Sequence, residues 1–166
     1  LDDDTLFLIY GAGNCIEDLQ SRIDSENITN VKIKGYVDNK YVPYVLSKSS
    51  VNVLNYSADK YNWSRGNSSN KLFEYLASGK PVISTVKMGY DILEKNNCGF
   101  STEVCCGESI ANFIKQIKSM DKSEYQSLCD NARETAKEFD MPILANKYLS
   151  IILEVKQNFE NSKKGV

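Results

Sequence analysis

One short segment of this chain carries the residues whose types and spacing best suit ligand chemistry. It runs from Asn67 to Thr85, NSSNKLFEYLASGKPVIST, and predicts a polar loop, a helix, a Gly stop and a buried strand. At about 100° per residue, the helix has one polar arc and one mostly apolar side. The arc holds Asn67, Asn70, Lys71, Glu74 and Ser78, and the other side holds Ser69, Leu72, Phe73, Leu76 and Ala77.

The expected start of this helix suits a phosphate group. Its first turn, from Ser68 to Lys71, should present backbone N–H groups without partners in the helix, at the positive end of the helix dipole. In an open parallel sheet, such a helix start lies at the carboxyl edge of the strands, where ligands bind. Ser68, Ser69, Asn70 and Lys71 are therefore candidate ligands of a diphosphate.

Glu74 suits a different part of the same ligand. It follows Asn70 by four residues, which is about 6 Å along a helix axis. Its carboxylate would repel a phosphate but could accept hydrogen bonds from a pair of vicinal hydroxyls, such as those of a ribose. Charge-assisted hydrogen bonds contribute roughly 1.5–3 kcal/mol each, so two of them could decide affinity. Phosphate at the helix tip and a sugar diol one turn deeper together describe a nucleoside diphosphate.

The stretch SSNKLFEYLASGKPVI resembles the nucleotide-sugar motif of GT-B glycosyltransferases of the family 4 type, most of all those of bacterial surface polysaccharide synthesis. The resemblance implies that Glu74 holds the donor ribose, and it places Gly79 to Ile83 on the Gly-Lys-Pro-Val-Ile of the family motif. It extends to LFLIYGAG near the start, to VKIKGYV and to NNCGFS. It implies the C-terminal, donor-binding half of a GT-B fold and a UDP- or GDP-linked sugar donor.

The chain departs from the family pattern at one position. Many members carry a second Glu eight residues before the helix Glu, close to the transferred sugar. Gly66 occupies that position here. A donor-sugar contact there does not carry over, and the identity of the sugar stays open.

A glycine-containing turn follows the apolar run from Leu6 to Tyr10. Gly11 and Gly13 form half of a dinucleotide-binding fingerprint, but Ile16 occupies the place of the third Gly. A tight turn that needs positive φ would also explain these glycines. The resemblance places this loop at the border of the donor site, so both explanations can hold.

Two further stretches are candidate contacts through the resemblance. It implies that backbone groups of Tyr36 and Val37 meet the nucleotide base, although a Tyr after a strand also serves for packing. It also implies that Val86 to Tyr90 line the donor-sugar pocket, with Met88 and Gly89 as the positions to examine first.

The loop from Asn55 to Gly66 is long for a compact α/β domain, and such loops are often functional. Arg65 is its best candidate for contacting the donor diphosphate or the sugar. The aromatic residues could face a sugar or an acceptor, or they could pin a surface loop. They are Tyr56, Tyr61 and Trp63.

The pattern along the chain predicts one Rossmann-like domain over residues 1–166, with a doubly wound parallel sheet and a helical C-terminal segment. Asp38 and Ser123 are expected helix caps. The expected strands are Leu6–Tyr10 (central and buried), Val31–Val37, Val51–Leu54, Pro81–Ser84 and Gly99–Ser101. The expected helices besides that of the motif are Cys15–Ile23, Asp38–Ser49, Asp91–Lys95, Glu108–Met120, Ser123–Phe139 and Met141–Phe159.

Composition narrows the function classes. The net charge of −2 gives no support for a nucleic-acid partner. Five cysteines without zinc-type spacing predict reduced thiols, and the absence of histidine excludes His-based metal sites and a His general base from this chain. Reduced thiols are typical of a cytoplasmic protein. The resemblance implies a nucleotide-sugar donor and no other cofactor, and no metal is expected because cationic side chains can stabilise the leaving diphosphate.

The start of the chain, Leu1-Asp2-Asp3-Asp4, indicates a piece of a longer protein whose N-terminal acceptor-binding domain is absent. Contact with the inner face of the membrane would come through that domain. In GT-B enzymes the last helix reaches back to the partner domain, so part of its apolar stripe should be exposed here. By itself the piece should bind nucleotide weakly and catalyse nothing.

The resemblance implies transfer of a hexosyl group to a polysaccharide or lipid-linked acceptor, in capsule or lipopolysaccharide synthesis. Two alternatives remain. A GT-B-fold epimerase of nucleotide sugars would use a similar half-site, usually with histidine. A non-catalytic binding or assembly domain would keep the fold without the chemistry, and Gly66 gives that alternative some support.

Overall fold

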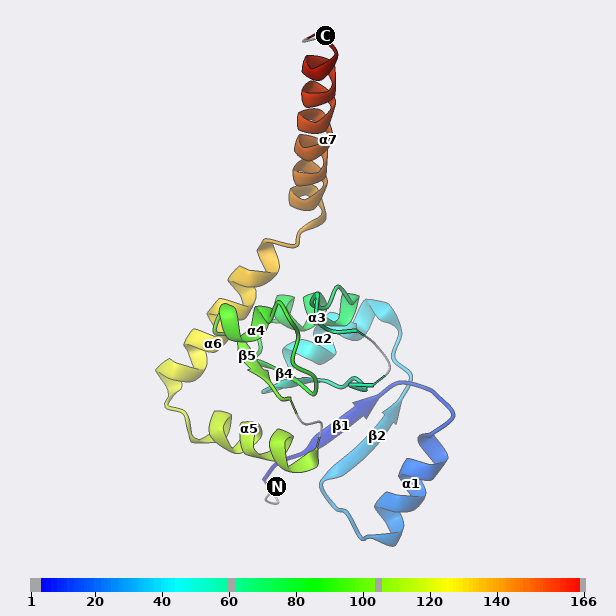
Figure 1. Ribbon diagram of the computed structural model, residues 1–166. Coiled ribbons are helices and arrows are strands. Elements are labelled where there is room, and N and C mark those ends of the chain that lie inside the picture. Colours follow the sequence, from blue (N-terminus) through cyan, green and yellow to red (C-terminus); the bar gives the residue numbers. More distant parts are fainter. Residues whose placement is uncertain (1–3, 60–61, 104–105, 165–166) are drawn as a thin grey trace.

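The computed structural model describes residues 4–59, 62–103 and 106–164 and shows an α/β protein with parallel strands (Figure 1). Its strands are β1 (Phe7–Tyr10), β2 (Val31–Gly35), β3 (Asn52–Leu54), β4 (Val82–Ser84) and β5 (Gly99–Ser101). Its helices are α1 (Ile16–Ser25), the 3-10 turn η1 (Asn39–Tyr41), α2 (Val42–Ser47), α3 (Asn70–Ala77), α4 (Ile92–Lys95), α5 (Gly107–Ser119), α6 (Lys122–Lys137) and α7 (Met141–Lys164).

The three strands β3, β4 and β5 form the sheet at the centre of the molecule. They pair in parallel in the order β3-β4-β5, and all three residues of β4 are buried. One face of β4 packs with α3 and α6 through Val82, Leu72 and Ala132. The other face packs with α5 through Ile83 and Ile114. Figure 1 shows α3 and α5 on opposite sides of this sheet. Because its three strands are parallel, the loops after them lie at one edge.

The first two strands form a separate two-stranded parallel sheet, with α1 beside it (Figure 1). The parallel α/β class is confirmed, but the strands divide between two sheets within the described ranges. The expectation that Leu6 to Tyr10 is a central, fully buried strand is wrong, because Leu6, Leu8 and Tyr10 are exposed. Along β1 the side chains alternate between half-buried and exposed, so one face of this two-stranded sheet is open to solvent.

Side-chain caps fix two helix starts. The Asp38 carboxylate accepts a hydrogen bond from the Lys40 backbone N–H, which confirms the predicted cap. For α6 the predicted cap Ser123 is wrong. Asp121 caps this helix instead and forms a capping box with Glu124, while the Ser123 hydroxyl donates to the Asp121 carboxylate.

The last helix projects away from the rest of the molecule (Figure 1). Its apolar residues are largely exposed, including Tyr148, Ile152, Val155 and Phe159. The expected exposure of this stripe is therefore confirmed. That a partner domain covers it stays a prediction.

Three general features concern the described ranges alone. No helix there is both long enough and apolar enough to cross a membrane. No three Cys, Asp or Glu side chains there are grouped to hold a metal ion. The described cysteines are all free thiols, whereas Cys105 and the candidate Tyr61 lie outside the described residues.

Candidate functional site

The start of α3 lies later in the chain than the sequence suggested. The helix begins at Asn70, with Ser69 as its N-cap in an extended conformation, so Ser68 belongs to the preceding loop. The predicted first turn from Ser68 to Lys71 is therefore wrong at its beginning. The reason is local, because the Asn67 side-chain oxygen accepts a hydrogen bond from the Ser69 backbone N–H at 2.8 Å. Such an Asx turn competes with the helix for that N–H.

The same segment holds two buried polar atoms without a partner. Asn67 Nδ2 and Ser69 Oγ are buried and make no hydrogen bond within the described structure. An unsatisfied buried group costs about 1–3 kcal/mol, so each calls for an explanation. Both side chains flank the helix start, where the Asn70 and Lys71 residues are exposed. This place therefore offers donors to an anion.

The two sides of α3 separate almost as predicted. Asn70, Lys71 and Glu74 are exposed, whereas Leu72 and Leu76 are buried in the core. Ala77 was expected on the apolar side but is exposed. At about 100° per residue it lies near Asn70 and Glu74 on the helix circumference, which explains the difference.

Glu74 lies on an open surface. It is solvent-exposed and lines neither of the two hollows described below. The pKa of the neighbouring Tyr75 is raised by burial, then by Tyr56 and by the Glu74 charge. Because Glu74 is exposed, its carboxylate is accessible to a ligand. The contact of Glu74 with a ribose stays a prediction.

A first hollow, here the Arg65 hollow, has a volume of about 280 Å³. It brings together two predicted diphosphate ligands, Arg65 and Ser68, with Asn67, whose Nδ2 has no hydrogen-bond partner within the described structure. The rings of Phe73 and Phe139 stack at 4.7 Å and form part of its wall. The lining residues are Arg65, Gly66, Asn67, Ser68, Phe73, Tyr90, Ile92 and Phe139.

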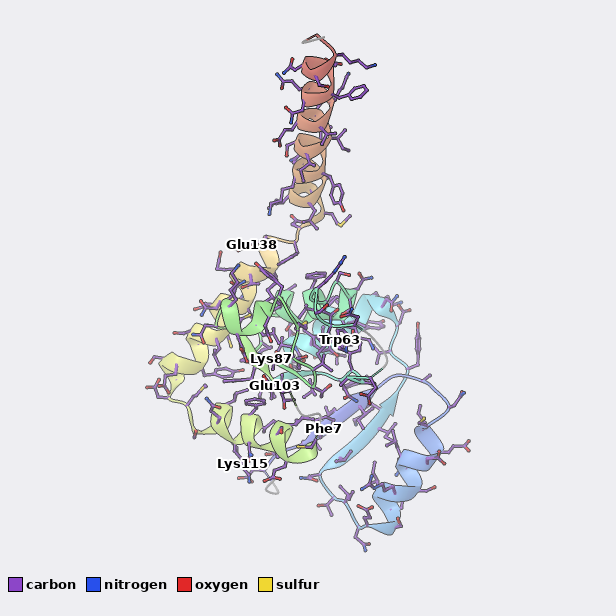
Figure 2. The ribbon with its side chains drawn as sticks, in the orientation of Figure 1. Phe7, Trp63, Lys87, Glu103, Lys115 and Glu138 are labelled. Atoms are coloured by element: carbon purple, nitrogen blue, oxygen red, sulfur yellow. The ribbon has the colours of Figure 1, made fainter. Side chains whose placement is uncertain are left out.

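A second hollow, here the Trp63 hollow, has a volume of about 500 Å³ and lies where the loops after β3, β4 and β5 meet. Figure 2 labels three of its residues, Trp63, Lys87 and Glu103. Lys87 Nζ lies 3.5 Å from a Glu94 carboxylate oxygen and 3.7 Å from one of Glu103. The lining residues are Ala58, Trp63, Val86, Lys87, Met88, Gly89 and Glu103.

The predicted stretch from Val86 to Tyr90 does line the hollows. Its first four residues face the Trp63 hollow, and Tyr90 faces the Arg65 hollow. Glu103 is a lining residue that sequence reasoning missed. Its only signal was its position just after β5, because ends of parallel strands gather ligand-binding residues.

The loops after β3 and β4 are joined tightly. The backbone N–H groups of Gly66 and Gly89 both donate to the Trp63 carbonyl oxygen, at 3.0 and 2.8 Å. A Cβ at Gly89 would lie 1.8 Å from the Ser64 carbonyl oxygen. Gly66 has a φ of +96°, which favours glycine. The backbone conformation of this loop therefore explains why Gly66 occupies the position where many family members carry Glu.

The predicted base and border residues lie on the loops after β1 and β2. The Gly11 N–H donates to the Gly35 carbonyl oxygen at 2.8 Å, which ties the loop after β1 to the end of β2. Tyr36 is 73% exposed, Val37 is half-buried, and a Cβ at Gly13 would meet no atom within 4 Å. None of these residues lines the two hollows. Their contact with a nucleotide stays a prediction.

A family comparison identifies the chain. The model of the glycosyl transferases group 1 family matches residues 1–120. The chain belongs to this family. The match covers the motif around Glu74, the loops after β1 and β2, the Trp63 hollow, and the Arg65 hollow except for Phe139. The family assignment therefore rests on the part of the chain that carries most of the candidate site. No curated protein matches the chain significantly by sequence.

Solved structures agree with the family assignment at the level of the fold. HepE of Anabaena, solved with UDP-glucose, aligns with a TM-score of 0.73 and 17% identity over 93% of this chain and 42% of its own. TarM aligns with a TM-score of 0.70 and 23% identity over 90% of this chain and 29% of its own. WaaG is described as a glycosyltransferase involved in lipopolysaccharide biosynthesis. It aligns with a TM-score of 0.65 and 18% identity over 90% of this chain and 38% of its own. The chain thus spans less than half the length of each.

Proposed function

We propose that this chain is the donor-binding domain of a glycosyltransferase and holds a nucleotide sugar at the start of α3. The observation that carries the proposal is the pair of unsatisfied buried atoms, Asn67 Nδ2 and Ser69 Oγ, beside that helix start. A helix N-terminus attracts an anion, and the unpartnered groups add a second and independent reason to place a ligand there.

The diphosphate ligands in this proposal are Ser68, Ser69, Asn70 and Lys71, with Arg65 from the adjoining hollow. The helix dipole and the Lys71 and Arg65 cations stabilise the negative charge that develops on the departing nucleoside diphosphate. Cationic side chains can perform this task, so the proposal requires no metal ion.

Glu74 accepts hydrogen bonds from the ribose hydroxyls, because its exposed carboxylate lies one turn beyond Asn70. The base lies against Tyr36 and Val37, which follow the end of β2 that the Gly11 hydrogen bond ties to the loop after β1. HepE has been solved with UDP and with UDP-glucose, so UDP-hexoses are the first donors to test, followed by GDP-linked ones.

The acceptor is a glycan or a lipid-linked sugar, bound by an N-terminal domain of the longer protein, in capsule or lipopolysaccharide synthesis. The general base, where one is needed, and any membrane contact lie in that domain. WaaG among the similar structures supports a cell-surface pathway.

Calorimetry on the full-length protein tests the proposal. A thermal-shift screen of UDP, GDP, ADP and CMP first selects the nucleotide, because a ligand of the native state raises its stability. Glu74→Ala should then weaken binding by at least tenfold, since it removes charge-assisted hydrogen bonds of about 1.5–3 kcal/mol each. Glu138→Ala, which removes an exposed Glu from the end of α6, is the matched control and should leave the nucleotide affinity unchanged.

A loss below about 1 kcal/mol at Glu74 is too small for two such hydrogen bonds and would contradict the ribose contact. Interconversion of the sugar without any acceptor would favour the epimerase alternative instead. Donor binding without transfer to any glycan acceptor would favour the non-catalytic one.

A further inference from the structure

The charges around the Trp63 hollow do not balance. Lys87 is paired with both Glu94 and Glu103, at 3.5 and 3.7 Å. The charge and hydrogen bond of Glu94 raise the pKa of Lys87, followed by smaller contributions from the charges of Glu103 and Asp91. Among the described residues, Lys87 is thus one cation paired with two carboxylates, so the cluster of Lys87, Glu94 and Glu103 carries a net negative charge beside the hollow.

The walls of the hollow are otherwise suited to a sugar ring. Trp63 supplies an aromatic wall, and its indole N–H donates to the Ser57 carbonyl oxygen at 3.2 Å, which holds the ring in place. The ring also packs against Tyr56 at 5.0 Å between centroids. Lys87 can donate hydrogen bonds and Glu103 can accept them, so a neutral diol can bind both without separating the charges.

We propose that the Lys87, Glu94 and Glu103 cluster selects an uncharged hexosyl group and rejects donors whose sugar carries a carboxylate. The inference rests on the proposed function, since it assumes that the sugar of the bound donor enters the Trp63 hollow. A sugar carboxylate would compete with the Glu94 and Glu103 carboxylates for Lys87. Because the single positive charge of Lys87 neutralises only one of these two negative charges, the remaining negative charge would also repel the sugar carboxylate.

The size of this selection follows from the exposure of the cluster. The Glu103 side chain is 77% exposed and that of Lys87 is 43% exposed, so solvent screens the charges strongly. Two unit charges about 4 Å apart in water interact enough to change an equilibrium about fivefold. We therefore expect about fivefold discrimination for each carboxylate and a smaller effect at high salt.

The experiment uses full-length protein and two matched donors, UDP-glucose and UDP-glucuronate. If the nucleotide screen selects GDP, the pair is GDP-mannose and GDP-mannuronate. Calorimetry gives the ratio of the two dissociation constants, with the free nucleoside diphosphate as a reference. The wild type should bind the neutral donor at least about fivefold more tightly than the acidic one. Glu103→Gln should reduce this ratio about fivefold, and the double variant Glu94→Gln/Glu103→Gln should reduce it about 25-fold.

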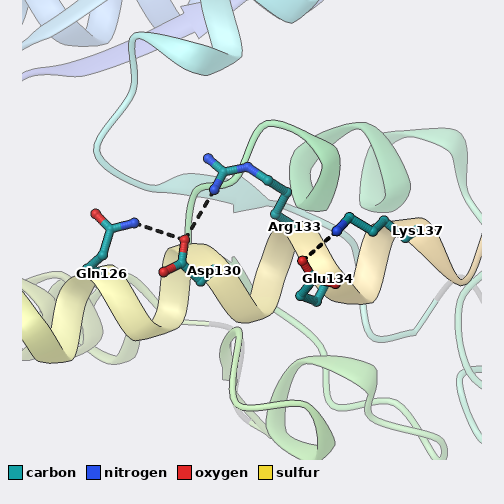
Figure 3. Close-up of polar contacts among 5 residues, drawn as sticks. All are labelled: Gln126, Asp130, Arg133, Glu134 and Lys137. Atoms are coloured by element: carbon teal, nitrogen blue, oxygen red, sulfur yellow. Dashed lines mark hydrogen bonds and ion pairs between the residues drawn. The ribbon is translucent and has the colours of Figure 1, made fainter.

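The matched control is Glu134→Gln. Figure 3 shows that Glu134 pairs with Lys137 on the surface of α6, a pair of the same kind that belongs to neither hollow. This variant should leave the ratio unchanged. The affinity for the free nucleoside diphosphate should stay within about twofold in every variant, because the nucleotide does not reach the cluster.

The outcomes separate this inference from the proposed function. An unchanged ratio in the double variant, or a wild type that prefers the acidic donor, would overturn the inference while nucleotide binding still supports the proposed function. If neither sugar changes the affinity relative to the free nucleoside diphosphate, the inference is likewise overturned and the proposed function is still supported. Failure to bind any nucleoside diphosphate would overturn both.

Discussion

The backbone N–H of Gly89 donates a hydrogen bond to the Trp63 carbonyl oxygen at 2.8 Å. This bond joins the loop after β3 to the loop after β4, and residues of both loops line the Arg65 and the Trp63 hollows. The relative position of the two loops therefore sets the shape of the candidate site.

The first prediction is that Gly89→Ala disrupts this joint. The new Cβ would lie 1.8 Å from the Ser64 carbonyl oxygen, so one loop must move. We expect a loss of about 1–3 kcal/mol in the free energy of unfolding, as for other overpacked positions, and at least tenfold weaker donor binding. Urea unfolding and calorimetry measure the two effects. Gly107→Ala is the control, because a Cβ there would meet no atom within 4 Å, and equal losses in both variants would contradict the prediction.

The second prediction concerns the family position at Gly66. Gly66→Glu restores the residue that many relatives carry, but its φ of +96° should cost a residue with a side chain about 1–2 kcal/mol. We expect lower stability in urea unfolding and no gain in donor affinity. An increase in donor affinity at unchanged stability would contradict this prediction. It would show that the loop adapts and that its backbone conformation does not require glycine at position 66. Gly107→Glu, at the first position of α5, serves as the comparison.

The third prediction concerns the reactivity of two thiols. Hydrogen bonds from the Ser109 side chain and backbone lower the pKa of Cys106, whereas burial raises the pKa of Cys98 to about 11. Because the thiolate is the reactive form, iodoacetamide at pH 7.5 should modify Cys106 faster than Cys98, as followed by peptide mass spectrometry.

Ser109→Ala removes the larger of these contributions, so the pH midpoint for modification of Cys106 should move upward. Modification of Cys98 should become appreciable only as the pH rises towards its raised pKa. Equal rates for both thiols in the native protein would contradict the structure around them.

The fourth prediction is that α7 contributes little to the stability of the described chain. Most of its apolar residues are exposed, so removing everything after Asp140 should change the thermal midpoint by less than about 3 °C, which corresponds to about 1 kcal/mol. Binding of a hydrophobic dye should fall at the same time, because the exposed stripe is gone. A large drop in the midpoint would show that α7 packs against the domain in solution.

Local patterns in the sequence determined most of the elements. The strand Gly99–Ser101 has the bounds expected for it, and α5 buries Ile114 and Ile117 on the face that the apolar spacing indicated. Leu72 and Leu76 lie inside and Glu74 outside for the same reason. These features depend on periods of two or 3.6 residues within one element, so they can be read from neighbouring positions alone.

The tertiary structure decided the features that depend on contacts between segments. The side chain of Asn67 moved the start of α3 to Asn70, and only the meeting of loops brought Glu103 beside Lys87. Leu8 lies on the open face of the two-stranded sheet and is exposed, although the apolar run around it is typical of a buried strand. A hydrogen bond or an ion pair between distant segments leaves no periodic trace in the sequence, and so these parts of the site required the fold.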